Sequence, residues 1–160
     1  ISPDAATQMR EKLPTLDKRQ ASNLIDSLLK LPVAVTQRVS PTQEILSTIQ
    51  KSKYALPVDH ISHLDLDFEI HGDLLFLEVR EFRGTLYMRR LTGNLGGFMR
   101  HKLSVQDVID LSKVIASNQY LYTKTFGEHY SCCGSCGAEL TDPVSRSLFL
   151  GPECRKKFGR

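Results

Sequence analysis

The sequence predicts an α+β fold, with N-terminal helices, an antiparallel β-meander, one further helix and a small cysteine-bearing module at the C-terminal end. Three observations predict it. Apolar residues in the first third recur at helical spacing. From about residue 64 the spacing changes to strict alternation, which indicates strands. All four cysteines lie within residues 132–154, which indicates one centre that holds them together.

The first region, residues 1–55, is expected to be helical. A Ser-Pro pair near the N-terminus suits a helix start, and Asp17 suits the N-cap of an amphipathic helix. Ser40, followed by Pro41, predicts another helix start, and Gln43 would complete its capping box. The apolar stripe expected on the second helix is Ala21, Leu24, Ile25, Leu28 and Leu29.

The second region, residues 56–126, is expected to hold the meander and a helix. Residues 64–71 alternate apolar and acidic side chains and predict a half-buried strand. Two more strands follow within residues 74–93, and Arg83-Gly84 forms the turn between them. A glycine-rich loop then leads to a helix, with Ser104 as N-cap and a buried stripe of Val105, Val108, Ile109 and Ile115.

Composition excludes some classes of protein and leaves others open. Of 160 residues 41% are apolar and 24% charged, as in ordinary folded domains. No run approaches the ~18 apolar residues of a membrane span, and no secretory signal opens the sequence, which favours the cytosol. The net charge is +3, but its distribution is uneven. Residues 59–73 carry five acids and no Lys or Arg, whereas residues 80–102 are rich in Arg.

The last region, residues 127–160, is expected to bind zinc. Cys133 and Cys136, followed by a glycine, form a knuckle of the kind that supplies half of a tetrahedral zinc site. Cys154 would add a third thiolate from the first turn of a short basic helix, after an intervening hairpin, as in treble-clef and zinc-ribbon modules. For the fourth ligand, Cys132 is available and His129 is the main rival. Asp142 is a poorer choice.

Other chemistry for these thiols is less well supported. A disulfide framework needs an oxidising compartment, for which the sequence shows no signal. A thioredoxin-like redox pair belongs in a βαβ context, which is absent, and an iron–sulfur cluster would need more closely spaced cysteines. A structural Zn²⁺ ion is therefore the predicted cofactor, and no arrangement of catalytic residues indicates an enzyme.

The stretch "CCGSCGAELTDPVSRSLFLGPECRKKFG" resembles a C-terminal zinc-binding module of bacteriophage-encoded proteins of unknown function. The resemblance covers about 30 residues and carries the elements Cys-x-x-Cys-Gly, Leu-Thr-Asp, Ser and Gly-Pro-x-Cys. Phe149-Leu150 departs from it, since small residues are commoner there. "LDKRQASNLIDSLLKLP" and "SKYALP" are more loosely similar to earlier parts of such proteins. The resemblance implies a phage accessory protein that acts in the host (bacterial) cytoplasm, without implying an activity.

Two functions follow as hypotheses. The first is binding of nucleic acid without sequence preference, through phosphate contacts. The second is binding to a host protein, such as RNA polymerase or a defence complex, as a modulator or inhibitor. A metal-dependent nuclease built on the acids and histidines of residues 60–73 is disfavoured, because one strand face explains them. Oligomeric state stays open. The candidate nucleic-acid contacts are Arg83, Arg89, Arg100, Lys102, Arg155, Lys156 and Lys157.

Overall fold

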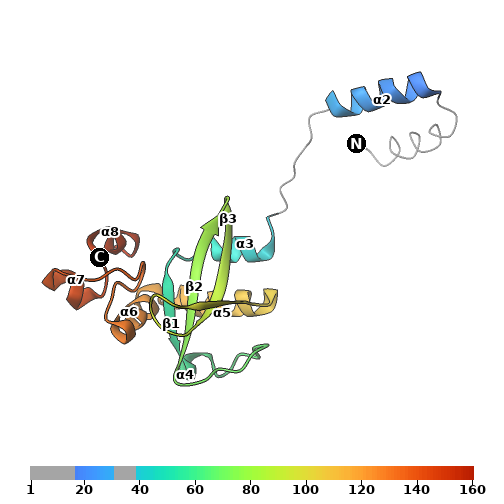
Figure 1. The fold of residues 1–160 in the computed structure, drawn as a ribbon. Coiled ribbons are helices and arrows are strands. Elements are labelled where there is room, and N and C mark those ends of the chain that lie inside the picture. Colours follow the sequence, from blue (N-terminus) through green and yellow to red (C-terminus); the bar gives the residue numbers. More distant parts are fainter. Residues whose placement is uncertain (1–16, 31–38) are drawn as a thin grey trace. The chain divides into compact units, whose positions relative to one another are not determined.

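The computed structural model describes residues 17–30 and 39–160, and the chain divides into two compact units, residues 1–38 and 39–160. The first unit contains the helix α2 (Lys18–Lys30). The second unit, drawn in Figure 1, confirms the α+β class. Its elements are α3 (Pro41–Leu46), β1 (Lys53–Pro57), α4 (Val58–Ile61), β2 (Leu74–Phe82), β3 (Thr85–Thr92), β4 (Met99–Lys102), α5 (Val105–Ser117), α6 (Gln119–Tyr130), α7 (Pro143–Leu148) and α8 (Pro152–Lys157).

Two of the predicted N-terminal helices are confirmed. Asp17 caps α2, and its Oδ1 atom accepts hydrogen bonds from the amides of Arg19 and Gln20. Ser40 caps α3 and accepts from the Gln43 amide. The Gln43 side chain does not complete a capping box, because it pairs with both backbone groups of Leu86 on β3. The helix expected before residue 14 lies outside the described residues.

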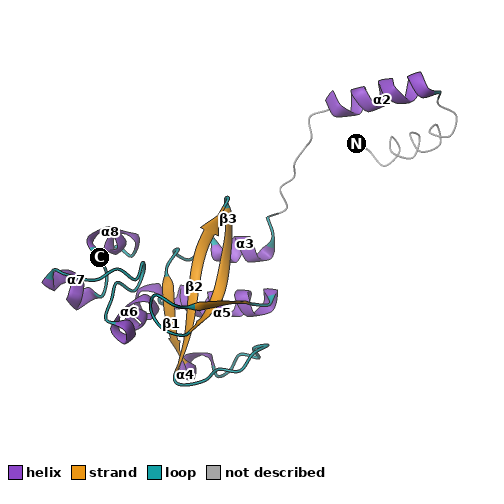
Figure 2. Cartoon of the chain, viewed as in Figure 1, coloured by secondary structure: helices purple, strands orange, loops and turns teal. Residues whose placement is uncertain are grey.

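The sheet has four antiparallel strands in the order β1-β2-β3-β4 (Figure 2). The predicted β2–β3 hairpin is confirmed, and its two-residue turn has positive φ at both Arg83 and Gly84, as a type I′ turn requires. Sequence analysis missed β1 and β4. Both are short, and β4 carries only polar residues after its first, so neither shows a clear apolar alternation.

The strand predicted at residues 64–71 is wrong. The chain bends at residues 67–68, although its burial alternates as expected, with acids exposed and apolar side chains packed against the core. It forms no strand because no ladder partner is paired with its backbone. The Asp67 amide of this segment donates two long hydrogen bonds, 3.4 Å each, to the buried carboxylate of Asp107 on α5.

The two faces of the sheet pack differently. One face carries Tyr54, Leu77, Val79 and Met88 into the main core, against α3 and α5. The helix α5 begins at the predicted Ser104 cap. Its first residue, Val105, was expected in the buried stripe but is 62% exposed, because the buried part of α5 begins only at Asp107. None of the described helices has the length and apolar character needed to cross a membrane.

The helix α6, which sequence analysis did not predict, contacts three hydrophobic clusters. Tyr122 belongs to the main core, Phe126 to a second cluster on the other face of the sheet, and Tyr120 packs against a third cluster in the cysteine module. The expected division at residues 1–55, 56–126 and 127–160 stays a prediction. Its two boundaries fall inside β1 and α6.

Candidate metal centre and its basic neighbour

Three of the four cysteines converge. The Sγ atoms of Cys133, Cys136 and Cys154 all lie within 4.8 Å of one another. Four sulfurs arranged tetrahedrally at the Zn–S distance of ~2.3 Å would be about 3.8 Å apart. The cluster is therefore close to the geometry of a bound divalent ion. Cys133 is buried, Cys154 is half-buried and Cys136 is exposed.

The knuckle is shaped by hydrogen bonds at its base. The Cys133 amide donates to the Ala138 carbonyl and the Gly137 amide donates to the Cys133 carbonyl, each at 2.8 Å. Gly137 has a φ of +81°, which closes the turn without strain only for glycine. The Gly151 amide donates to Cys133 Sγ at 3.4 Å and thereby connects the knuckle to the start of α8. As predicted, Cys154 lies in the first turn of α8.

The knuckle lies directly against α6. A Cβ atom at Gly134 would come within 1.9 Å of the Thr123 carbonyl oxygen, so the two backbones touch. The Thr123 hydroxyl in turn donates to the Lys53 carbonyl of β1 at 3.2 Å and lies 3.1 Å from the Ser52 hydroxyl. The knuckle therefore contacts α6, and α6 is in turn hydrogen-bonded to β1 of the sheet.

The hairpin predicted between the knuckle and Cys154 is wrong, since α7 occupies this position. The Leu-Thr-Asp motif instead starts a helix: Asp142 is the N-cap, and both carboxylate oxygens lie 3.1 Å from the Ser145 amide. Asp142 does not join the cysteine cluster. Ser145 lines the same pocket as the three cysteines, and its buried hydroxyl has no hydrogen-bond partner among the described residues.

Neither Cys132 nor His129 joins the cluster. Cys132 is buried among Ala55, Leu91 and Phe126. Cys132 thus lies in an apolar cluster, whereas the adjacent Cys133 belongs to the thiol cluster. His129 is exposed, and its ring lies against Phe76, tilted by 45° with the centroids 5.0 Å apart.

Electrostatics favour a cation at the cluster. Burial acts to raise the pKa of the Cys133 thiol, but backbone amides of Gly151, Cys136 and Ser135 outweigh it, and the pKa is lowered. Burial, followed by the charges of the other two cysteines, raises the pKa of Cys154 to about 11. Three adjacent thiolates repel one another, so a divalent ion that neutralises them is favoured and releases protons as it binds.

The donor set fits zinc as a structural ion. Thiolates are the usual ligands of structural Zn²⁺. Cys133, Cys136 and Cys154 would hold the ion and join the knuckle to α8. Among the described residues no fourth His, Cys, Asp or Glu belongs to the cluster.

The strand register brings three of the predicted basic residues together. Arg89 pairs with Glu78 on one side and with Lys102 on the other, and Lys53 is the partner of Glu78 on β1. Because side chains alternate, residues two positions along share this face. We call it the basic face, and it is formed by Lys53, Arg80, Arg89, Arg100 and Lys102.

The other predicted contacts lie nearby or on α8. Arg83 is in the β2–β3 turn, next to the basic face. Lys156 pairs with Glu153 on α8, whose basic residues also include Arg155. Lys157 Nζ donates to the Lys51 carbonyl at 3.4 Å, which connects α8 to the start of β1. The contacts predicted from the sequence omitted Lys53, because β1 was not recognised, and Arg80, whose position beside Glu78 only the structure shows.

A buried carboxylate lies at the centre of the basic face. Glu78 is 3% exposed, and it is surrounded by Arg100 at 2.8 Å, Lys53 at 3.5 Å and Arg80 at 3.9 Å. Burial acts to raise the pKa of Glu78, but the Arg100 hydrogen bond and the three cations outweigh it and lower the pKa. One negative charge against three positive charges leaves an excess of two at this point.

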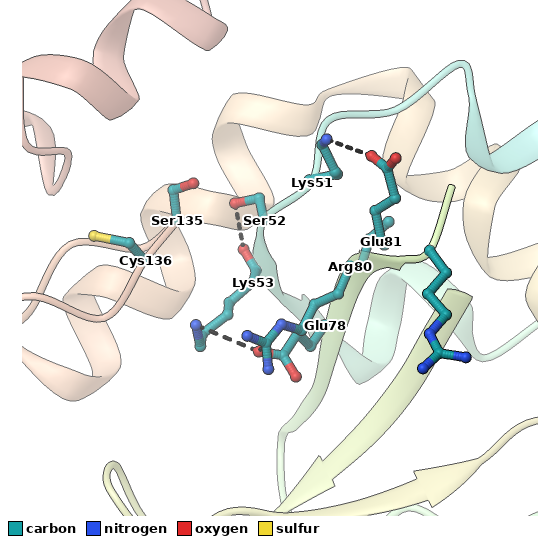
Figure 3. Close-up of a pocket in the computed structure, with 10 residues that line it drawn as sticks. Lys51, Ser52, Lys53, Glu78, Arg80, Glu81, Ser135 and Cys136 are labelled. Atoms are coloured by element: carbon teal, nitrogen blue, oxygen red, sulfur yellow. Dashed lines mark hydrogen bonds and ion pairs between the residues drawn. The ribbon is translucent and has the colours of Figure 1, made fainter. Parts of the chain in front are cut away.

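Two clefts separate the basic face from the knuckle. One, of about 470 Å³, lies between Lys53, Glu78 and Arg80 on the sheet and Ser135 and Cys136 on the knuckle (Figure 3). The other, of about 370 Å³, continues past Lys53 and Cys136 to Arg100 and the glycines of the β3–β4 loop. The clefts share Lys53 and Cys136, and we call the pair the groove.

Comparisons with known proteins add one family. A model of a family of unknown function, DUF6011, matches residues 123–159, which include the end of α6 and the whole cysteine module. Neither a curated protein nor a solved structure shows a significant match. The C-terminal part of the chain is thus similar to a recognised family to which no activity is assigned.

Proposed function

We propose that this chain is a phage-encoded accessory protein that binds nucleic acid without sequence preference in the bacterial cytoplasm. Its basic face makes the contacts and a structural zinc ion stabilises the module beside it. The role is one of binding, with no catalytic step. The observation that carries the proposal is the register, which gathers five cations on one face around a single buried acid.

The physical reason is charge density. Phosphates are bound by Lys and Arg, and affinity falls with salt in proportion to the number of phosphates neutralised. The +3 net charge of the chain is modest, but the basic face alone carries five cations against the one carboxylate of Glu78. Lys157, near Lys51, extends this surface toward α8. The setting in a phage-infected cell is supported by the motif resemblance alone.

The test is a salt titration of binding to a fluorescent DNA duplex, measured by anisotropy. Arg89→Gln should weaken binding and reduce the slope of log K against log salt by about 0.9, the value for one lost phosphate contact. Arg90→Gln is the matched control, because Arg90 is the next residue on the same strand and its guanidinium lies over Phe68, 4.7 Å from the ring centroid, on the opposite face. Equal effects of the two variants, or no binding of either duplex or single-stranded DNA at low salt, would refute the proposal.

A second candidate, binding to a host protein, is favoured by the acidic segment at residues 59–73. Its five acids are all exposed, while apolar residues between them hold the segment on the core. Such a surface complements a basic partner. Asp65→Lys with Glu69→Lys should abolish stoichiometric capture of a host protein from nuclease-treated lysate. If the double variant captures the same host protein as the wild type does, this candidate is contradicted.

A further inference from the structure

The nature of the bound nucleic acid can be inferred from the side chains that accompany the charges. Phe82 and Tyr87 share the basic face, since Arg80 pairs with Tyr87 and Phe82 pairs with Thr85. Phe82 is 63% exposed, so its ring is accessible to a ligand. Both rings lie at the end of the face nearest the β2–β3 turn.

Each ring is accompanied by a guanidinium. The Arg89 Cζ atom lies 5.0 Å from the Tyr87 ring centroid and the Arg83 Cζ atom lies 5.2 Å from that of Phe82. A cation beside an aromatic ring is the pair that single-strand-binding surfaces use, with the ring for a base and the cation for its phosphate. A duplex keeps its bases paired and stacked inside, so it cannot offer them to these rings.

The groove leads to the same conclusion. Each cleft is within the ~300–1,000 Å³ range of pockets that take one small ligand, so each accommodates a nucleotide unit. Lys53 lines both clefts, and its side chain is only 15% exposed. The knuckle forms the opposite wall, so a flexible chain can enter where a rigid duplex is kept away.

We propose that the basic face and the groove bind a single strand of nucleic acid. Phosphates contact Lys53, Arg80 and Arg100, and bases stack on Tyr87 and Phe82. The proposal rests on the proposed function and specifies its ligand. Glu78 is a positioning residue, because it holds the three cations at fixed places without contacting the strand.

The experiment compares a single-stranded DNA of about 12 nucleotides, within the usual range of site sizes, with its duplex at equal salt. Wild-type protein loaded with zinc should bind the single strand at least tenfold more tightly. Phe82→Leu and Tyr87→Leu should each weaken single-strand binding about fivefold or more, as loss of one stacking contact predicts, and leave duplex binding within twofold. Met99→Leu is the control, since Met99 is an exposed apolar residue on the opposite face.

A second readout identifies stacking directly. The chain has five tyrosines and no tryptophan, so its emission reports tyrosine alone. Addition of the single strand should quench part of this emission in wild type and in Met99→Leu, but not in Tyr87→Leu. Equal affinity for the two probes, or aromatic variants that bind like wild type, overturns the single-strand proposal and leaves nucleic-acid binding intact. Failure to bind either probe overturns both.

Discussion

The contact between the knuckle and α6 can be tested by one added methyl group. Gly134→Ala places a Cβ atom 1.9 Å from the Thr123 carbonyl oxygen, and real Cβ contacts are essentially never below 3.0 Å. The two backbones must therefore separate by at least 3.0 − 1.9 = 1.1 Å. Neither can relax by rotating a side chain, because the blocking atom is a helix carbonyl.

The cost has two parts. Overpacking at a buried site costs about 1–3 kcal/mol. Displacement of the knuckle also strains the hydrogen bond from the Gly134 amide to the Phe149 carbonyl, 2.8 Å long, worth about 0.5–1.5 kcal/mol. Together they lower the free energy of unfolding by about 2–4 kcal/mol. Zinc affinity should fall as well, because the same bond holds α7 and α8 to the knuckle.

Urea unfolding followed by circular dichroism, with zinc in excess, measures the effect. Gly97→Ala is the matched control: its φ is ordinary and the nearest atom, the Asn94 carbonyl oxygen, is 4.0 Å from the added Cβ. We expect that control to stay within about 0.5 kcal/mol of wild type. If Gly134→Ala is as stable as Gly97→Ala, the close approach of knuckle and helix is wrong.

Three further predictions concern the thiols, the buried acid and the sheet edge. Native mass spectrometry should find one zinc per chain in wild type and in Cys132→Ala, and none after Ser replaces any cysteine of the cluster; zinc lost from Cys132→Ala would contradict the assignment. Glu78→Gln should lower the free energy of unfolding by about 1–3 kcal/mol above pH ~4.5, since the folded pKa is depressed. The difference in unfolding free energy between wild type and Glu78→Gln should shrink as the pH falls through the folded pKa of Glu78. A difference that does not depend on pH would exclude a role for the charge. Loss of zinc in acid affects the wild type and the variant alike. Gln43→Ala removes two hydrogen bonds to Leu86, 2.6 and 2.9 Å long, and should cost about 1–3 kcal/mol in thermal or urea unfolding; no loss would mean that water replaces them.

Local signals in the sequence predicted local structure well. Caps at Asp17, Ser40 and Ser104 start helices where expected, because a side-chain oxygen that accepts an amide hydrogen bond acts within three residues. The Arg83-Gly84 turn is likewise set by two residues. The capping box predicted at Ser40 lacks its second half, since the Gln43 side chain contacts distant backbone instead; the Asp107 side chain, three residues after Ser104, does the same.

Long-range pairing could not be read from the chain. The alternation at residues 64–71 is real, but a strand also requires a partner, and the pattern contains no information about one. For the same reason, alternation along a strand places the adjacent Arg89 and Arg90 on opposite faces but does not show that Lys53 and Lys102 join Arg89. The cysteine pattern identified the cluster, whereas the placement of Cys132 depended on the core around it.

The position of α6 limits how the protein can be dissected. Tyr120, Tyr122 and Phe126 are spread along one helix and fill three separate apolar clusters, so no cut within it leaves all three intact. A fragment that starts at residue 127 would keep the three clustered cysteines but lose the part of α6, at Thr123, against which the knuckle packs. Expression of the isolated C-terminal segment should therefore begin no later than Gln119, and the truncated remainder would expose the sheet surface that Phe126 covers.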